Sequence, residues 1–181
     1  MSATSVLHQV CTYFGGAYDA DAHAYLDPQV PGLGSVRRAR GKRTDHNELH
    51  GGMATETHGT AMLVHIASGE ESRAAIAGAH SGLKLVRFEV ILHVFLHSSA
   101  EYAEDGQDAF FALRDSLFDR FHADRTLGSG GFENPGPPPG FQAGEGAGPP
   151  LRWEMDPVET SQNVTRGYLS IGFAADQYIA A

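Results

Sequence analysis

A fourteen-residue segment, 84–97, alternates between two kinds of side chain for its whole length and constrains the fold more than any other part of the chain. Its even positions are all apolar. They are Val86, Phe88, Val90, Leu92, Val94 and Leu96. The odd positions are mixed in character, and a period of two with one apolar side is typical of a strand that has one dry face. At about 3.3 Å per residue the segment would reach roughly 45 Å, so we expect it either to bend at a bulge or to project from the sheet.

Other segments supply the partners of this strand. We expect a helix over residues 3–14 and a second over 104–123, because apolar side chains recur there at spacings of three and four. Strands are predicted at 61–67, 151–155 and 165–174. Residues 36–40 are interpreted as an edge strand, and residues 68–82, which include three glycines, as an excursion at the tip of a hairpin. Residues 128–150 are rich in glycine and proline and predict a surface loop.

This order of elements predicts one α+β domain over residues 1–181, with a mostly antiparallel sheet, helices on one face and a long projecting strand or hairpin. The formal net charge is −9, which argues against generic nucleic-acid binding. The single cysteine, Cys11, excludes an internal disulfide and lies among apolar neighbours, so we interpret it as a buried side chain in a protein of a reducing compartment. We find no secretory signal pattern and no apolar run long enough to span a membrane.

Few groups in the sequence point to catalysis. His46, Glu48 and His50 do not have the spacing of the helical zinc-protease motif. His93 and His97 fall on one face of the long strand, but they are too far apart to share an ion without help from another strand. There is no serine nucleophile motif and no phosphate-binding glycine loop. We therefore expect a protein that is not an enzyme and holds no cofactor or metal.

A basic cluster is the clearest candidate for a functional patch on this acidic chain. It consists of Arg37, Arg38, Arg40, Lys42 and Arg43. A run of charges is often only a solvated loop, but this one could also bind an acidic protein surface or, less readily, nucleic acid. The mixed face of the long strand adds Glu89, His93 and His97 as candidate interface residues.

Four segments together resemble the tail terminator, or tail completion, proteins of long-tailed bacteriophages. They are the strand 85–96, the helix that contains Asp108-Ala109-Phe110-Phe111-Ala112-Leu113, the turn Asp124-Arg125-Thr126-Leu127-Gly128, and the closing strand 167–173. The resemblance covers roughly residues 1–15 and 61–176. It implies a hexameric ring that caps the tail tube, stops tube polymerisation and presents a surface to the head connector.

That resemblance also implies partners and a location. The partners would be further copies of the chain, the tail tube protein and a head-closure or connector protein, with nucleic acid present only as DNA passing through the ring. The protein would be made in the host cytoplasm and would end in the virion. Three alternatives remain open from the residues. One is another neck or tail component, and a second is a small metal- or ligand-binding α+β domain that uses His46, His50 and His58. The third is a nucleic-acid-binding adaptor that uses the basic residues from Arg37 to Arg43.

Overall fold

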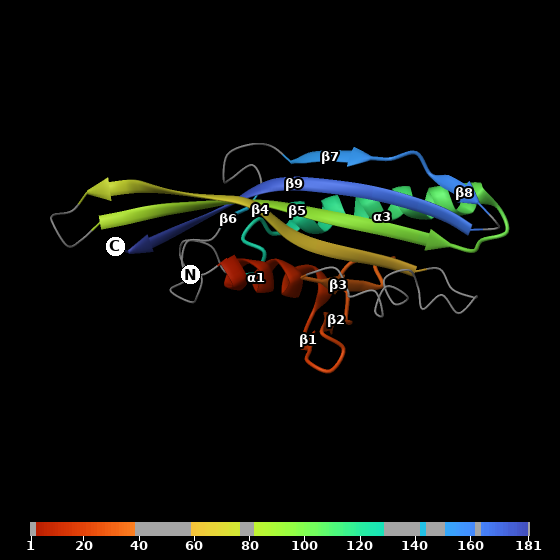
Figure 1. Cartoon of the computed structure of the whole chain (residues 1–181), viewed down its shortest axis with the longest axis horizontal. Helices are drawn as coiled ribbons and strands as arrows, with labels where there is room; N and C mark the ends of the chain where they lie inside the picture. The colour runs from red at the N-terminus through yellow and green to blue at the C-terminus, as the bar shows by residue number, and fades with distance from the viewer. Residues whose placement is uncertain are drawn as a thin grey trace.

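The computed structural model describes residues 3–38, 59–76, 82–128, 142–143, 151–161 and 164–180. Its helices are α1 (Ala3–Gly15) and α3 (Ala103–Ala123). Its strands are β1 (Tyr18–Asp19), β2 (Ala24–Tyr25), β3 (Ser35–Arg37), β4 (Gly59–Ile76), β5 (Gly82–Ser98), β6 (Gln142–Ala143), β7 (Arg152–Met155), β8 (Glu159–Ser161) and β9 (Val164–Ala180). Figure 1 shows these elements along the chain.

All the described strands belong to one sheet with the order β1-β2-β3-β4-β5-β9-β6, and β7 and β8 also pair with β9. Every pairing is antiparallel except that of β3 with β4, which is parallel. The prediction of an α+β fold with a mostly antiparallel sheet is therefore confirmed. The sheet is mixed, because β3 enters it in the same direction as β4.

The long alternating segment forms the centre of this sheet. β5 runs without a register shift along β9, and it pairs with β4 on its other side. The sequence predicted a bulge in this strand or its projection from the sheet. The irregularities lie in the neighbouring strand, because β4 has register shifts between Ile66 and Ser68 and between Arg73 and Ala75. In Figure 1, one end of β4, β5 and β9 extends past α1 and α3.

The core lies between the even-numbered side of β5 and the two helices. Val90 and Val94 of β5 are fully buried in the same cluster as Phe14 of α1 and Phe110 of α3. The apolar faces predicted for both helices are thus confirmed, and the helix bounds agree to within a residue. The helices also contact each other, because the rings of Phe14 and Phe121 stack with centroids 6.4 Å apart.

A turn after α3 fixes the end of this helix. The carboxylate of Asp124 accepts hydrogen bonds from the backbone N–H of Thr126, at 2.8 Å, and from that of Gly128, at 2.9 Å. Leu127 is fully buried and has a φ of 48°, followed by Gly128 with a φ of 76°. The side-chain amide of Gln9 in α1 donates to the Leu127 carbonyl. The Asp-Arg-Thr-Leu-Gly motif therefore joins α3 to α1.

Two sequence interpretations were wrong and one lies largely outside the described residues. Of the edge strand predicted over 36–40, the described residues 36 and 37 belong to β3, which is an inner strand because it lies between β2 and β4. Of the excursion predicted over 68–82, the described residues are instead part of the long strands, since β4 continues to Ile76 and β5 begins at Gly82. Of the glycine- and proline-rich segment 128–150, the structure describes Gly128 and β6, which pairs with β9.

Candidate functional site

The side of β5 that faces away from the core carries a row of ring-bearing and apolar side chains. Odd-numbered residues of β5 point to this outer face, and the register places residues of β4 and β9 beside them. Leu63 is opposite His93, His65 is opposite Ile91, and Tyr168 is opposite Phe95. We call the five residues His65, Ile91, His93, Phe95 and Tyr168 the outer-face patch. His65 is exposed, and the other four are half-buried.

The rings of the outer-face patch contact one another across three strands. The centroids of His65 and His93 are 6.0 Å apart, and those of Phe95 and Tyr168 are 5.3 Å apart. His93 and Tyr168 stack with 22° between their planes, and the Tyr168 hydroxyl lies 2.6 Å from His93 Nδ1. Contacts of this kind fix the side chains of neighbouring strands relative to each other. The patch is therefore an ordered surface on the long strands.

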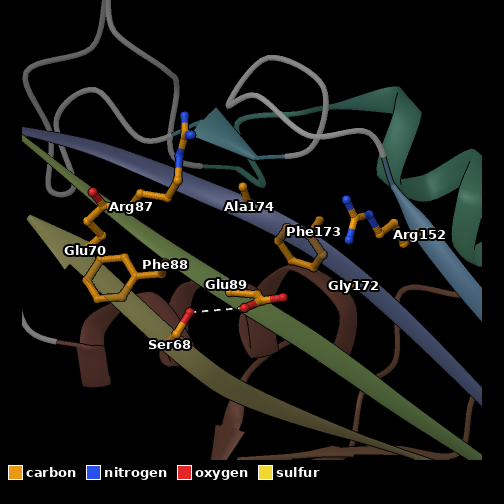
Figure 2. A pocket seen from close by; sticks show the side chains of 9 residues that line it. All are labelled: Ser68, Glu70, Arg87, Phe88, Glu89, Arg152, Gly172, Phe173 and Ala174. Carbon is orange, nitrogen blue, oxygen red and sulfur yellow. Dashed lines mark hydrogen bonds between the residues drawn. The ribbon is translucent and has the colours of Figure 1, made fainter.

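Further along the same face, the patch gives way to charged residues around a shallow hollow of about 190 Å³ (Figure 2). Ser68, Glu89 and Arg152 are among the residues that line it, and Figure 2 shows Ser68 and Glu89 pointing toward each other. Their Oγ and Oε2 atoms are 3.0 Å apart. Gly172 contributes to the hollow by lacking a side chain, because a Cβ there would have no heavy atom nearer than 4.0 Å.

Chemically, the outer face offers groups for recognition. Hydroxyl, carboxylate, guanidinium and imidazole groups are present, and the one cysteine is elsewhere. Cys11 is fully buried in α1, and burial raises the pKa of its thiol to about 12, which opposes nucleophilic chemistry. Within the described ranges, no group of three or more histidine, cysteine, aspartate or glutamate side chains could hold a metal ion. Nor is any described helix long and apolar enough to cross a membrane.

The structure places the predicted residues of the mixed strand face on this outer face. Glu89 is exposed beside the hollow, and His93 is in the patch. His97 is half-buried near the C-terminal end of β5, where it is opposite Gly59 and Arg166. Their role as interface residues stays a prediction. His65 and Tyr168 were not singled out from the sequence. The alternation of 165–174 indicates that Tyr168 and the core residue Leu169 point to opposite faces of their strand. The sequence alone does not determine the register of this strand with β5.

The basic cluster is described only at its first two residues. Arg37 is buried on β3 with 8% of its surface exposed. Arg38 donates a hydrogen bond to His8 Nε2 and lies over the ring of Tyr18, 4.8 Å from the centroid. Both side chains therefore pack within the chain. Arg40, Lys42 and Arg43 lie outside the described residues, as do His46, His50 and His58.

The contact with Arg38 also sets the state of His8. Burial, and then the positive charge of Arg38, lower the pKa of His8 below its ordinary value of 6.5. A guanidinium can only donate, so Nε2 of His8 is the acceptor, and Nδ1 carries the proton toward the Tyr25 hydroxyl 2.6 Å away. This cluster joins α1 to β2 and to the residue after β3, which is a structural role.

No known protein family matches the sequence, and no curated protein matches it.

Proposed function

We propose that this chain is a structural protein of a phage virion that forms a ring on the end of the tail tube, ends tube polymerisation and provides the surface for head attachment. The observation that carries the proposal is the outer-face patch, an ordered and partly apolar surface on strands that are far longer than the domain needs. The resemblance to tail terminator proteins supplies the assembly in which such a surface would be used.

The composition of the outer-face patch supports a protein–protein contact. Interface centres are enriched in aromatic residues and depleted of charge, and their rims are polar. Here Ile91, Phe95 and Tyr168 occupy the centre, while Glu89 lies toward one end and Arg166 toward the other. Burial of the half-exposed rings against another subunit would contribute about 25 cal/mol for each Å² of apolar surface removed from water.

The lengths of the strands support the same proposal. β4, β5 and β9 have 18, 17 and 17 residues, whereas strands of about five or six are the most common. They continue past both helices (Figure 1), so their ends can reach a neighbouring subunit without displacing the core. In the proposed assembly the long hairpin and the glycine- and proline-rich segment 128–150 are the arms, and the helices cover one face of each subunit's sheet.

A ring of this kind needs no chemical step. A subunit that offers one tube-like face binds the last ring of the tube, and growth stops when its other face cannot accept another tube subunit. The proposed partners are other copies of this chain, the tube protein, and a head-closure or connector protein.

The resemblance implies six copies in the ring. The basic residues Arg40, Lys42 and Arg43 would then serve an acidic surface on one of these partners, and nucleic acid would be present only as DNA in the ring's channel. A different neck or tail component, such as a head-closure, connector or tube protein, is the second candidate, because an outer face of this kind would serve its contacts equally well.

Deletion of the gene from the phage or prophage that encodes it tests the proposal. We expect tails of uncontrolled length lying free beside filled heads, measured by negative-stain electron microscopy of lysates. Tails of normal length that fail to join heads would assign the protein to head closure instead. Intact particles would contradict both assignments and favour the metal- or ligand-binding alternative.

Complementation of that deletion with point variants tests the outer-face patch itself. Phe95→Asp places a charge at the centre of the patch and should not restore tail length. Tyr102→Asp is the matched control, because Tyr102 is 60% exposed at the start of α3 and does not belong to the patch. Both purified variants should keep the circular-dichroism spectrum of the unaltered protein. Equal restoration by the two variants would exclude the patch as an assembly surface.

A further inference from the structure

The outer-face patch brings two histidines from different strands together. His65 of β4 is opposite Ile91, and His93 of β5 is opposite Leu63, so the two are diagonal neighbours on one face. Their ring centroids are 6.0 Å apart. His97 lies two ladder positions from His93 and is too distant to share an ion with it. The second imidazole comes instead from His65 on the neighbouring strand β4.

This separation suits two imidazoles that share one metal ion. With a metal–nitrogen distance of about 2.1 Å, the centroids of two rings on one ion lie roughly 5 to 6.5 Å apart, depending on the angle at the metal. His65 is exposed, so its ring can turn toward the ion and water can complete the coordination sphere. Side chains on paired strands of a sheet also lose little further freedom on binding, because the sheet already holds their backbones in place.

Tyr168 supplies the support that a metal-binding histidine requires. Its hydroxyl lies 2.6 Å from Nδ1 of His93, and its ring stacks on the imidazole. A hydrogen bond at one ring nitrogen fixes the orientation and tautomer of a ligating histidine. Because Tyr168 holds Nδ1, the ligating nitrogen of His93 is Nε2.

We propose that His65 and His93 form a two-histidine site on the outer face for a divalent transition-metal ion such as Cu²⁺ or Zn²⁺, with Tyr168 as a positioning residue. Imidazole nitrogen suits these ions, and Cu²⁺ binds most tightly in the divalent series. The two histidines are the site's only ligands among the described residues, so water fills the other positions. The site does not depend on the proposed tail function.

Cu²⁺ titration of the full-length chain tests the site, with electron paramagnetic resonance used to count the bound nitrogens. The background variant should carry His46→Gln, His50→Gln and His58→Gln, which removes the other histidine cluster. We expect one equivalent of Cu²⁺ bound through two imidazole nitrogens. His65→Gln or His93→Gln should weaken binding at least about tenfold and leave one nitrogen, and Tyr168→Phe should weaken it about tenfold with both nitrogens kept.

Two histidines serve as controls in the same background. His97→Gln removes an imidazole from the same strand face, and His122→Gln removes an exposed one near the end of α3. Neither change should alter Cu²⁺ affinity. Affinity unchanged by His65→Gln, or lowered equally by His97→Gln, would overturn the assignment. Melting temperatures without metal should agree among the variants, which separates loss of binding from loss of folding.

Discussion

Arg87 and Asp176 form a two-pronged ion pair across β5 and β9. Nε and Nη2 of Arg87 each lie 2.7 Å from one carboxylate oxygen of Asp176. The arginine side chain is 41% exposed, whereas that of Asp176 is 9% exposed. The guanidinium therefore compensates a carboxylate that water reaches poorly.

Replacing Arg87 with methionine should lower the free energy of unfolding by about 2 kcal/mol, because it leaves the Asp176 carboxylate without its paired charge. Urea unfolding measured by circular dichroism checks this value. Arg152→Met is the matched control, since Arg152 is an exposed arginine on the same face, and its effect should stay within about 0.5 kcal/mol. Equal effects of the two changes would show that the pair contributes nothing measurable.

Gly167→Ala should destabilise the protein by about 1 to 3 kcal/mol through overpacking. A Cβ at this position of β9 would lie 2.8 Å from two ring atoms of Phe110 in α3. Gly172→Ala in the same strand is the control, because its Cβ would meet nothing nearer than 4.0 Å. Thermal unfolding of the two variants should separate them, and a second change, Phe110→Leu, should recover part of the loss in Gly167→Ala.

The thiol of Cys11 should not react in the folded protein. It is fully buried, and burial raises its pKa to about 12, so almost no thiolate is present at neutral pH. Labelling with a chromogenic disulfide reagent should give less than one-tenth of a thiol per chain in native buffer and about one in denaturant, since the chain has one cysteine. Rapid labelling without denaturant would contradict the packing of α1 described above.

The turn after α3 should make stability depend on acidity. Burial alone would raise the pKa of Asp124, but hydrogen bonds from Thr126 and Gly128 outweigh it, and the pKa lies below its ordinary value of 3.8. A carboxyl whose pKa is lower in the folded state contributes stability above its unfolded pKa, and this contribution disappears as pH falls through the folded pKa. The contribution should therefore be complete at pH 6 and be lost below about pH 4.

Asp124→Ala isolates this effect. The variant should be less stable than the unaltered protein at pH 6, by about 1 to 2 kcal/mol for the lost hydrogen bonds, and the difference should shrink as the pH is lowered toward 3. Urea midpoints at several pH values measure it. Asp115→Ala is the control on the exposed side of α3. A difference that stays constant over the whole range would mean that the ionised form of Asp124 is not what stabilises the turn.

The sequence was sufficient for the local elements but not for their pairing. Alternation identified β5 and part of β9, and the spacing of apolar residues identified both helices, because these periods follow from the geometry of a single element. The place of β3 could not be read in the same way. A three-residue strand has too little pattern to show that its neighbours are β2 and β4, and its parallel direction depends on contacts made far away in the chain.

The candidate site shows the same division. Glu89, His93 and His97 were recognised because they follow one another on a single strand. The contacts of His93 with His65 and Tyr168 depend on the register of three strands, and the bulge after Ile66 changes which residues of β4 face outward beyond it. A one-residue shift in either pairing would have placed other side chains beside His93. Local periodicity carries no information about such a shift.

β5 is bonded along nearly its whole length on both sides, by β4 and by β9. Interstrand hydrogen bonds in antiparallel pairs run across the strands, so tension applied along the strands loads many of these bonds together in shear. The two ladders cannot open one bond at a time under such a load. The long axis of the molecule should therefore resist stretching far better than its helical layer does, and a particle that transmits force along this axis would deform elsewhere first.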